Sequence, residues 1–165
     1  MELRPYNEGD LSLTTALESD PAVMKELGGP VPAEQVAPIH QERLAGDWFF
    51  TIVPDGADQA AGIVGVWQTP WDGGSVYEAG LLLLPHFQGK GIGLKALAMV
   101  IDRARRQAAF PRLHAFPAVT NGPSNAVCEK LGFTLLEQRD LDYQGRPLRC
   151  NHWVLELTAA PGAAG

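Results

Sequence analysis

Three glycines at alternate positions, Gly89, Gly91 and Gly93, stand between a wholly apolar run and a segment with helical periodicity. Glycines directly before a helix let main-chain N–H groups converge on an anion, and the positive end of the helix dipole adds to the attraction. Phosphate is the usual ligand of such a loop. The stretch Gln88-Gly89-Lys90-Gly91-Ile92-Gly93 therefore predicts a phosphate-binding loop, to which Lys90 adds a positive charge.

Two common phosphate-binding motifs do not fit this loop. A P-loop needs Gly-x-x-x-x-Gly-Lys followed by Ser or Thr, which the segment does not supply. A dinucleotide fingerprint, Gly-x-Gly-x-x-Gly, would place its third glycine where Leu94 stands. The loop does match a third pattern throughout: Gln or Arg, two residues, Gly, one residue, then Gly or Ala.

Glu78 is a single carboxylate in an otherwise apolar stretch. Period-two counting along a strand places it on the same face as Gly80, Leu82 and Leu84. A carboxylate is expensive to bury unless it faces water or a partner. Glu78 is therefore a candidate general base, and the alternative is a Glu that is exposed at a strand start or satisfied by a neighbouring strand.

The cysteines and histidines do not suggest a metal site. Cys128 and Cys150 lack a second ligand at zinc spacing, so we expect free thiols and no structural metal. The four histidines show neither triad order nor metal spacing, and we expect each to lie at the surface or in satisfied packing: His40, His86, His114 and His152.

Composition suits one domain with a sizeable core, because 45% of the 165 residues are hydrophobic and 19% are charged. We expect this domain over residues 1–157, and residues 158–165 read as a flexible tail. The net charge of -6 argues against nucleic-acid or anionic-membrane partners and fits a cationic small substrate slightly better. With no apolar run long enough to span a bilayer, we expect a cytoplasmic protein.

The chain must position Glu78 and the glycine loop with a mixture of strands and helices. We expect a first strand over residues 3–6 and a helix from an Asp10 N-cap to Glu18. Short helices are expected over 21–45, interrupted at Gly28-Gly29-Pro30 and at Pro32 and Pro38. Alternating patterns predict three antiparallel strands over residues 48–53, 61–68 and 76–84. An amphipathic helix from Ile92 follows, and after it come a strand over 112–119, a short helix over 123–131 and two strands over 133–137 and 150–157. The expected fold class is α+β, a central, largely antiparallel mixed sheet of about six to seven strands with helices on both faces.

A second motif follows the amphipathic helix. The segment from Asn121 to Phe133 reads Asn-x-x-Ser and then Glu-Lys-x-Gly-Phe. With the loop at residues 88–93, this segment makes the sequence resemble the GNAT superfamily of N-acetyltransferases, which transfer an acyl group from acetyl-CoA to an amine. The resemblance extends well over residues 48–157. The general pattern of the sequence is similar to the bacterial branch that includes acetyltransferases of ribosomal-protein N-termini.

The resemblance implies a binding mode for coenzyme A. The amides of Gly89, Lys90, Gly91, Ile92 and Gly93 would meet the pyrophosphate, while Gln88 hydrogen-bonds or positions the loop. The pantetheine arm would lie against Leu82, Leu83 and Leu84 as an extra strand, where a main-chain N–H stabilises the oxyanion. This mode needs a sheet splayed between its fourth and fifth strands; Gly80 allows a bulge and Pro117 cannot donate a ladder bond, although Pro117 equally fits a strand end.

The departing thiolate needs a proton. Many family members have a Tyr seven residues after the motif's Asn, and Cys128 occupies that position here. Cys128 is one candidate donor, although buried inert cysteines are commoner. Ser124, one helical turn earlier on the same face, is the favoured candidate. Asn121 either bonds the cofactor's amides or starts the helix.

The resemblance thus implies an acetyl-CoA-dependent N-acetyltransferase that works by direct attack in a ternary complex. Its acceptor would be a primary amine of a small molecule or of a peptide or protein N-terminus, and dimerisation is an expectation at the level of the family. The alternative is a module of the same fold that binds acyl-CoA without catalysis. Because one fold can host many functions, the acceptor is left open at this point.

Overall fold

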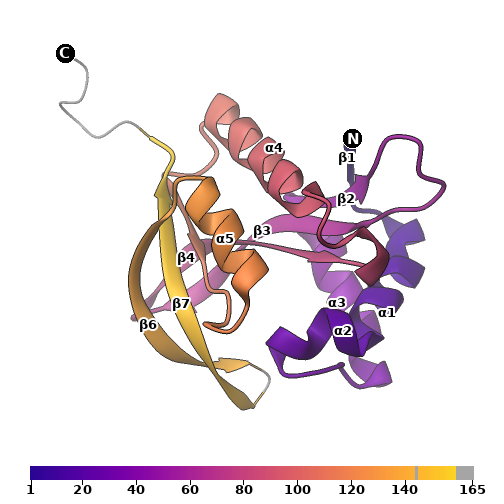
Figure 1. Cartoon of the computed structure of the whole chain (residues 1–165), viewed down its shortest axis with the longest axis horizontal. Helices are drawn as coiled ribbons and strands as arrows, with labels where there is room; N and C mark the ends of the chain where they lie inside the picture. Colours follow the sequence, from indigo (N-terminus) through magenta and orange to yellow (C-terminus); the bar gives the residue numbers. More distant parts are fainter. Residues whose placement is uncertain (144, 159–165) are drawn as a thin grey trace.

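The computed structural model describes residues 1–143 and 145–158. Seven strands form one sheet in the order β1-β2-β3-β4-β5-β7-β6, with helices on both faces (Figure 1). The α+β class and the strand number are as the sequence predicts. Of the expected tail, all but Thr158 lies outside the described residues.

The first half of the sheet is an antiparallel set of four strands: β1 (Glu2–Pro5), β2 (Phe49–Val53), β3 (Gly62–Trp71) and β4 (Gly74–Leu83). The register between β3 and β4 is continuous from the Gly62 and Leu83 pair to the Trp71 and Gly74 pair, so the strand does not form the bulge that Gly80 would allow. Gly80 instead makes room for an aromatic ring, since a Cβ atom there would lie 2.7 Å from the Trp67 indole.

The second half consists of β5 (Arg112–Ala115), β6 (Thr134–Tyr143) and β7 (Arg146–Glu156). In the described part of the chain, β4 and β5 share a single parallel register pair, Glu78 with His114. After β5 the chain stays with β7, because the Pro117 carbonyl accepts from the Asn151 amide at 2.9 Å. The sheet is therefore splayed between its fourth and fifth strands, as expected.

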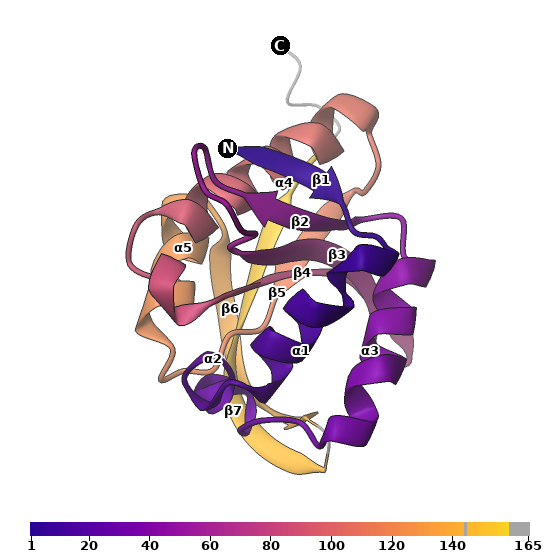
Figure 2. The ribbon, with the colours of Figure 1, turned by 90° about the vertical axis from the view of Figure 1, so that its right-hand side faces the viewer.

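Two helices cover one face of the sheet. The apolar side of α4 (Ile92–Gln107) and Cys128 of α5 (Gly122–Lys130) pack on Ala79, Leu113 and Trp153 in the largest core cluster. On the other face lie α1 (Leu11–Ser19), α2 (Pro21–Met24) and α3 (Ala33–Ala45), which are below β1 to β4 in Figure 2. Short 3-10 turns, Glu8–Asp10, Lys25–Leu27 and Pro85–Phe87, join these elements.

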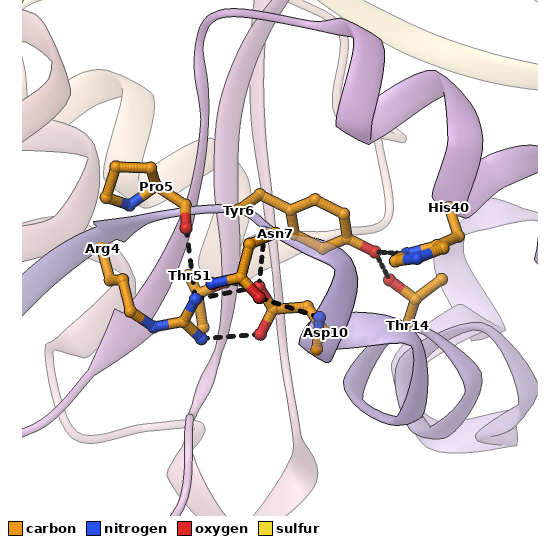
Figure 3. A network of polar contacts seen from close by, with 9 residues as sticks. Arg4, Pro5, Tyr6, Asn7, Asp10, Thr14, His40 and Thr51 are labelled. Carbon is orange, nitrogen blue, oxygen red and sulfur yellow. Dashed lines mark hydrogen bonds and ion pairs between the residues drawn. The ribbon is translucent and has the colours of Figure 1, made fainter.

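Of two expectations about the N-terminal helices, one is confirmed in part and one is wrong. Asp10 is the N-cap residue of α1, as predicted, but its side chain does not cap the helix; it accepts hydrogen bonds from the Arg4 guanidinium at 2.7 and 3.1 Å and from the Thr51 hydroxyl at 3.0 Å. Pro38 does not interrupt α3, which continues through it for 13 residues. Figure 3 shows the Asp10 contacts beside the Tyr6 hydroxyl, which bonds to Thr14 and His40. These buried polar contacts hold α1 and α3 against the strands.

The last hairpin is longer than the sequence indicates. β6 continues to Tyr143 and β7 begins at Arg146, whereas the predicted strands end at residue 137 and begin at residue 150. The added residues are largely polar on both faces, so hydrophobic alternation does not detect them. Within the described residues, no helix combines the length and apolarity that a membrane crossing requires.

Candidate active site

The glycine loop joins the end of β4 to the start of α4. Gly89 and Gly91 have φ angles of 72° and 77°, which L residues with a side chain rarely adopt. A Cβ atom at either position would meet nothing within 4 Å, so their backbone conformation, not space, requires glycine. Gly91 is the N-cap of α4 and no side chain caps the helix. Its first amides therefore have no intrahelical partner and are able to bind an anion.

The other loop residues divide into positioning and packing roles. The Gln88 side-chain amide donates to the Leu83 carbonyl at 3.0 Å, which ties the loop to the end of β4. Lys90 is exposed and Ile92 is half-buried. Gly93 is buried, and a Cβ atom there would lie 3.2 Å from the Leu81 side chain. Gly93 therefore also allows α4 to pack closely on β4.

The free edge of β4 faces the opening in the sheet. The Leu84 amide donates to the Ala61 carbonyl at 2.9 Å. Because alternate residues of an antiparallel strand bond to the same neighbour, the main-chain groups of Leu82 and Leu84 are directed to β3. Those of Leu81 and Leu83 face the opening, where an extended molecule would be able to pair with them.

Glu78 lies at the vertex of the opening, beside its register partner His114. Its carboxylate is half-buried and accepts a hydrogen bond from the Thr69 hydroxyl. Burial raises the pKa of Glu78, while Thr69 and Trp67 act in the opposite direction. A carboxylate whose pKa is moved toward neutrality is better suited to accept a proton reversibly.

The second motif forms the start of α5. The Asn121 side chain accepts from the Ser124 amide at 3.2 Å, so Asn121 caps the helix. Ser124 is half-buried, one turn before Cys128. Cys128 is 4% exposed within the core, and burial raises its pKa to about 12. Such a thiol is a weaker acid than an ordinary thiol, which favours a packing role for Cys128 over proton donation.

Asn125 is a structural residue that the sequence analysis missed. Its side-chain amide donates to the carbonyls of Ala118 and Asn121, at 2.9 and 2.8 Å. Its side-chain oxygen accepts from Asn151 and from the Trp153 indole, both at 2.8 Å. Asn125 thus joins α5 to β7, on the far side of the opening from Glu78. An Asn just after the Asn-x-x-Ser motif is the signal that could have drawn attention to it.

Two histidines form a pair that the sequence analysis did not anticipate. His114 on β5 and His152 on β7 are buried, with 2.8 Å between the Nδ1 atom of His114 and the Nε2 atom of His152. Trp71 and Phe116 pack on the His152 ring at centroid distances of 4.8 Å each. Burial lowers the pKa of both histidines. The His152 Nδ1 atom has no hydrogen-bond partner among the described residues, so this pair departs from the satisfied packing that we expected.

The remaining histidines agree with the expectation, since His40 is buried against the Tyr6 hydroxyl and His86 is exposed. Both cysteines are free. Across residues 1–143 and 145–158, no group of three or more His, Cys, Asp and Glu side chains is placed to hold a metal ion.

The site thus combines a mixed sheet that opens between the parallel strands β4 and β5 with a glycine loop and a helix N-terminus at the end of β4. Such a site is suited to an extended molecule that carries phosphate groups. A family model described as an acetyltransferase (GNAT) domain matches residues 1–134. The chain therefore belongs to the GNAT acetyltransferase family. Comparison with curated proteins by sequence gives no match.

Solved structures share the fold over nearly the whole chain. An acetyltransferase (GNAT family) from Bacillus anthracis has a TM-score of 0.78 at 18% identity, covering 94% of this chain and 93% of its own. A ribosomal-protein-alanine N-acetyltransferase from Brucella melitensis has 0.74 at 23% identity, with coverage of 94% and 99%. A spermidine N-acetyltransferase from Vibrio cholerae, in complex with CoA and spermine, has 0.76 at 17% identity, with coverage of 94% and 95%. At these identities the likeness concerns the fold.

Proposed function

We propose that the protein is an acetyl-CoA-dependent N-acetyltransferase acting on a primary amine. The observation that carries this proposal is the position of Glu78, whose carboxylate has a raised pKa and lies at the vertex of the opening, on the strand whose end leads into the glycine loop. Acetyl-CoA supplies an acetyl group activated as a thioester. The Vibrio cholerae structure, which holds CoA and spermine on the same fold, supports both the donor and the class of acceptor.

The chain offers a cradle for each part of the donor. The N-terminal amides of α4, from Gly91 and Ile92 to Gly93, and the charge of Lys90 would bind the two phosphates. The main-chain groups of Leu81 and the amide of Leu83 would pair with the amide groups of the pantetheine arm; the Leu83 carbonyl already accepts from Gln88. The Leu84 amide is already bonded to Ala61 and is not available for this role.

Two side chains would move protons. An alkylamine is almost fully protonated at pH 7, so Glu78 takes its proton before attack. The Ser124 hydroxyl would hydrogen-bond the departing sulfur and relay a proton to it from water, so that the serine regains the proton it gives; the buried Cys128 thiol, with a pKa of about 12, lies in the core and is not suited to this role. Cys128 is also buried, which disfavours an acyl-cysteine and supports direct transfer to the amine in a ternary complex.

Calorimetry with acetyl-CoA and a thiol-release assay across amino acids, polyamines and short peptides test the proposal. We expect binding, and release of free CoA thiol with at least one amine. Binding without release for every amine would instead favour a non-catalytic acyl-CoA-binding module. A protein that does not bind acetyl-CoA at all would exclude both functions.

Hydrogen exchange locates the binding edge. We expect acetyl-CoA to slow exchange of the Leu81 and Leu83 amides and to leave the Leu84 amide, which is already hydrogen-bonded, unchanged. Equal slowing of all three would argue against pairing at this edge. For the proton donor, Ser124→Ala should lower kcat while Cys128→Ala keeps it; if neither substitution changes kcat, water supplies the proton.

A further inference from the structure

A cavity of about 120 Å³ lies between residues 27–32 and the tip of the hairpin formed by β6 and β7. Figures 1 and 2 both show the end of β6 and the start of β7 beside the segment that connects α2 to α3. Gly28 and Gly29 are among the lining residues, and the lining residues with polar side chains are Gln35, Tyr143 and Arg146. Arg146 is the one charged residue among the lining residues that the structure describes.

Gly28 and Gly29 make room for the Arg146 side chain. Both have positive φ angles, 89° and 95°. A Cβ atom at Gly28 would lie 3.4 Å from the Cδ atom of Arg146, and one at Gly29 would lie 3.4 Å from its Nη1 atom. The two glycines therefore shape a turn across which the Arg146 side chain extends along the cavity wall.

Arg146 differs from the other arginines of its hairpin. Arg139 forms an ion pair with Asp72 at 2.8 Å, and Arg149 with Asp140 at 3.3 Å. Within the part of the chain that the structure describes, no carboxylate lies within ion-pair distance of Arg146. In a chain with a net charge of -6, an unpaired cation in a cavity is available for an anion from outside.

The cavity lies next to the face of the sheet that carries Glu78. Leu82 is on the Glu78 face by period-two alternation, and it packs against Met24 and Val31, on either side of the cavity-lining glycines. Tyr143 connects the two regions, because it lines the cavity and lies close enough to Glu78 and Glu18 for their charges to act on it. A molecule seated on Arg146 would be able to extend past Tyr143 toward Glu78.

We propose that this cavity binds a carboxylate of the acceptor, so that the acceptor is an amine that also carries a carboxylate, such as an amino acid. The inference rests on the proposed function, because it assigns the substrate class of that same site. The Arg146 guanidinium has the planar donor pair that matches a carboxylate. The Tyr143 hydroxyl and the Gln35 amide supply further donors. The carboxylate end is held at Arg146, and the amine end points to Glu78.

Matched acceptors test this assignment. Thiol release is measured for α- and ω-amino acids and for their carboxamides, which keep the amine and lose the negative charge. We expect kcat/KM to be about 10- to 100-fold higher for the carboxylate of the favoured pair. Arg146→Gln should remove that preference and leave the carboxamide within about twofold of the wild-type value, and Arg146→Lys should restore part of the preference.

Arg149→Gln is the control, because it removes an arginine from the same hairpin whose charge is paired with Asp140; the preference should remain. Equal turnover of both members of every pair, or an equal loss for both in Arg146→Gln, would overturn the carboxylate assignment while the acetyltransferase function stands. A failure to release thiol with every acceptor tested would instead overturn the acetyltransferase function, and this assignment with it. Because Arg146 is exposed, we expect its variants to keep the wild-type melting temperature. An unchanged melting temperature excludes unfolding as the cause of any lost preference.

Discussion

Replacing Glu78 with Gln tests the proposed base most directly. Gln has nearly the same shape and its side-chain oxygen can still accept the Thr69 hydrogen bond, but it cannot take a proton. For an amine with a pKa of about 10.4, the free base is about one part in 2,500 at pH 7 and about one part in 25 at pH 9. Deprotonation in solution thus costs about 4.6 kcal/mol at pH 7 and about 1.9 kcal/mol at pH 9.

Without the base, the variant has to select the free amine from solution. We expect Glu78→Gln to lose a factor of about 10² to 10³ in kcat/KM at pH 7, within the usual range for general-base catalysis. Its log kcat/KM should then rise by about one per pH unit up to pH 9, so that most of the loss disappears. The wild-type profile should level off above the pKa of Glu78, which burial has raised.

The assay is thiol release at saturating acetyl-CoA from pH 6.5 to 9.5, with calorimetry to show that donor binding is unchanged. A loss by the same factor at every pH would refute the base assignment and make Glu78 a positioning or structural residue. Complete recovery at high pH would leave Glu78 with proton transfer as its sole contribution.

The same substitution also predicts a change in stability. The folded-state pKa of Glu78 lies above its unfolded value, so the folded chain retains the proton to higher pH than the unfolded chain does. The contribution of Glu78 to the unfolding free energy is therefore fully present below the unfolded-state pKa of this residue, and it is lost as pH rises through the folded-state pKa. Glu78→Gln cannot titrate, so chemical denaturation should find it more stable than wild type above that interval, with the advantage vanishing toward pH 4. A constant difference at all pH values would contradict the raised pKa.

Three further substitutions or titrations probe the framework. Gly91→Ala should destabilise the fold by about 1–2 kcal/mol and weaken acetyl-CoA binding. Gly93 is inside the helix, so Gly93→Ala should change the unfolding free energy by less than about 1 kcal/mol. Urea denaturation measures the two stabilities and calorimetry measures the binding. Asn125→Ala leaves its hydrogen-bond partners unpaired and should cost about 2–4 kcal/mol by urea denaturation. His114 and His152 have folded pKa values below the ordinary value of 6.5, so the unfolded chain protonates first and unfolding free energy should fall as pH drops below that value; His152→Gln should flatten this decline.

Local patterns predict much of the sheet and of the loop. The alternation that ends at Leu84 and the helical periodicity that begins at Ile92 depend on neighbouring residues alone, so both elements can be located from the sequence. Gly91 is similar, since a glycine before a helix is needed for a positive φ angle wherever the chain turns in this way. The splay follows less directly. Pro117 indicates that a ladder is interrupted, but only the pairing of Glu78 with His114 shows where.

Sites that depend on contacts between distant segments could not be predicted. Arg146 and Gly28 are more than a hundred residues apart in the sequence, and nothing in either neighbourhood indicates that one lies over the other. The His114 and His152 pair requires the register of β5 on β7, and the extension of β7 beyond the apolar run sets which residues surround it. A continuous α3 despite Pro38 has the same origin, because burial of Val36 and His40 stabilises the helix from outside.

The opening in the sheet leaves main-chain groups without hydrogen-bond partners, which is energetically unfavourable. This explains why separate contacts fix the strands on its two sides. Main-chain groups without a partner, such as those of Leu81 and the amide of Leu83, are unfavourable unless water or a bound molecule satisfies them. A sheet would therefore tend to close unless each side were fixed independently. Gln88 fixes one side by bonding to the Leu83 carbonyl. Pro117 and Asn125 fix the other, by turning the chain after β5 toward β7 and by tying α5 to the same strand. Because neither set of contacts crosses the opening, an extended molecule can enter and pair with β4 without breaking a hydrogen bond of the fold.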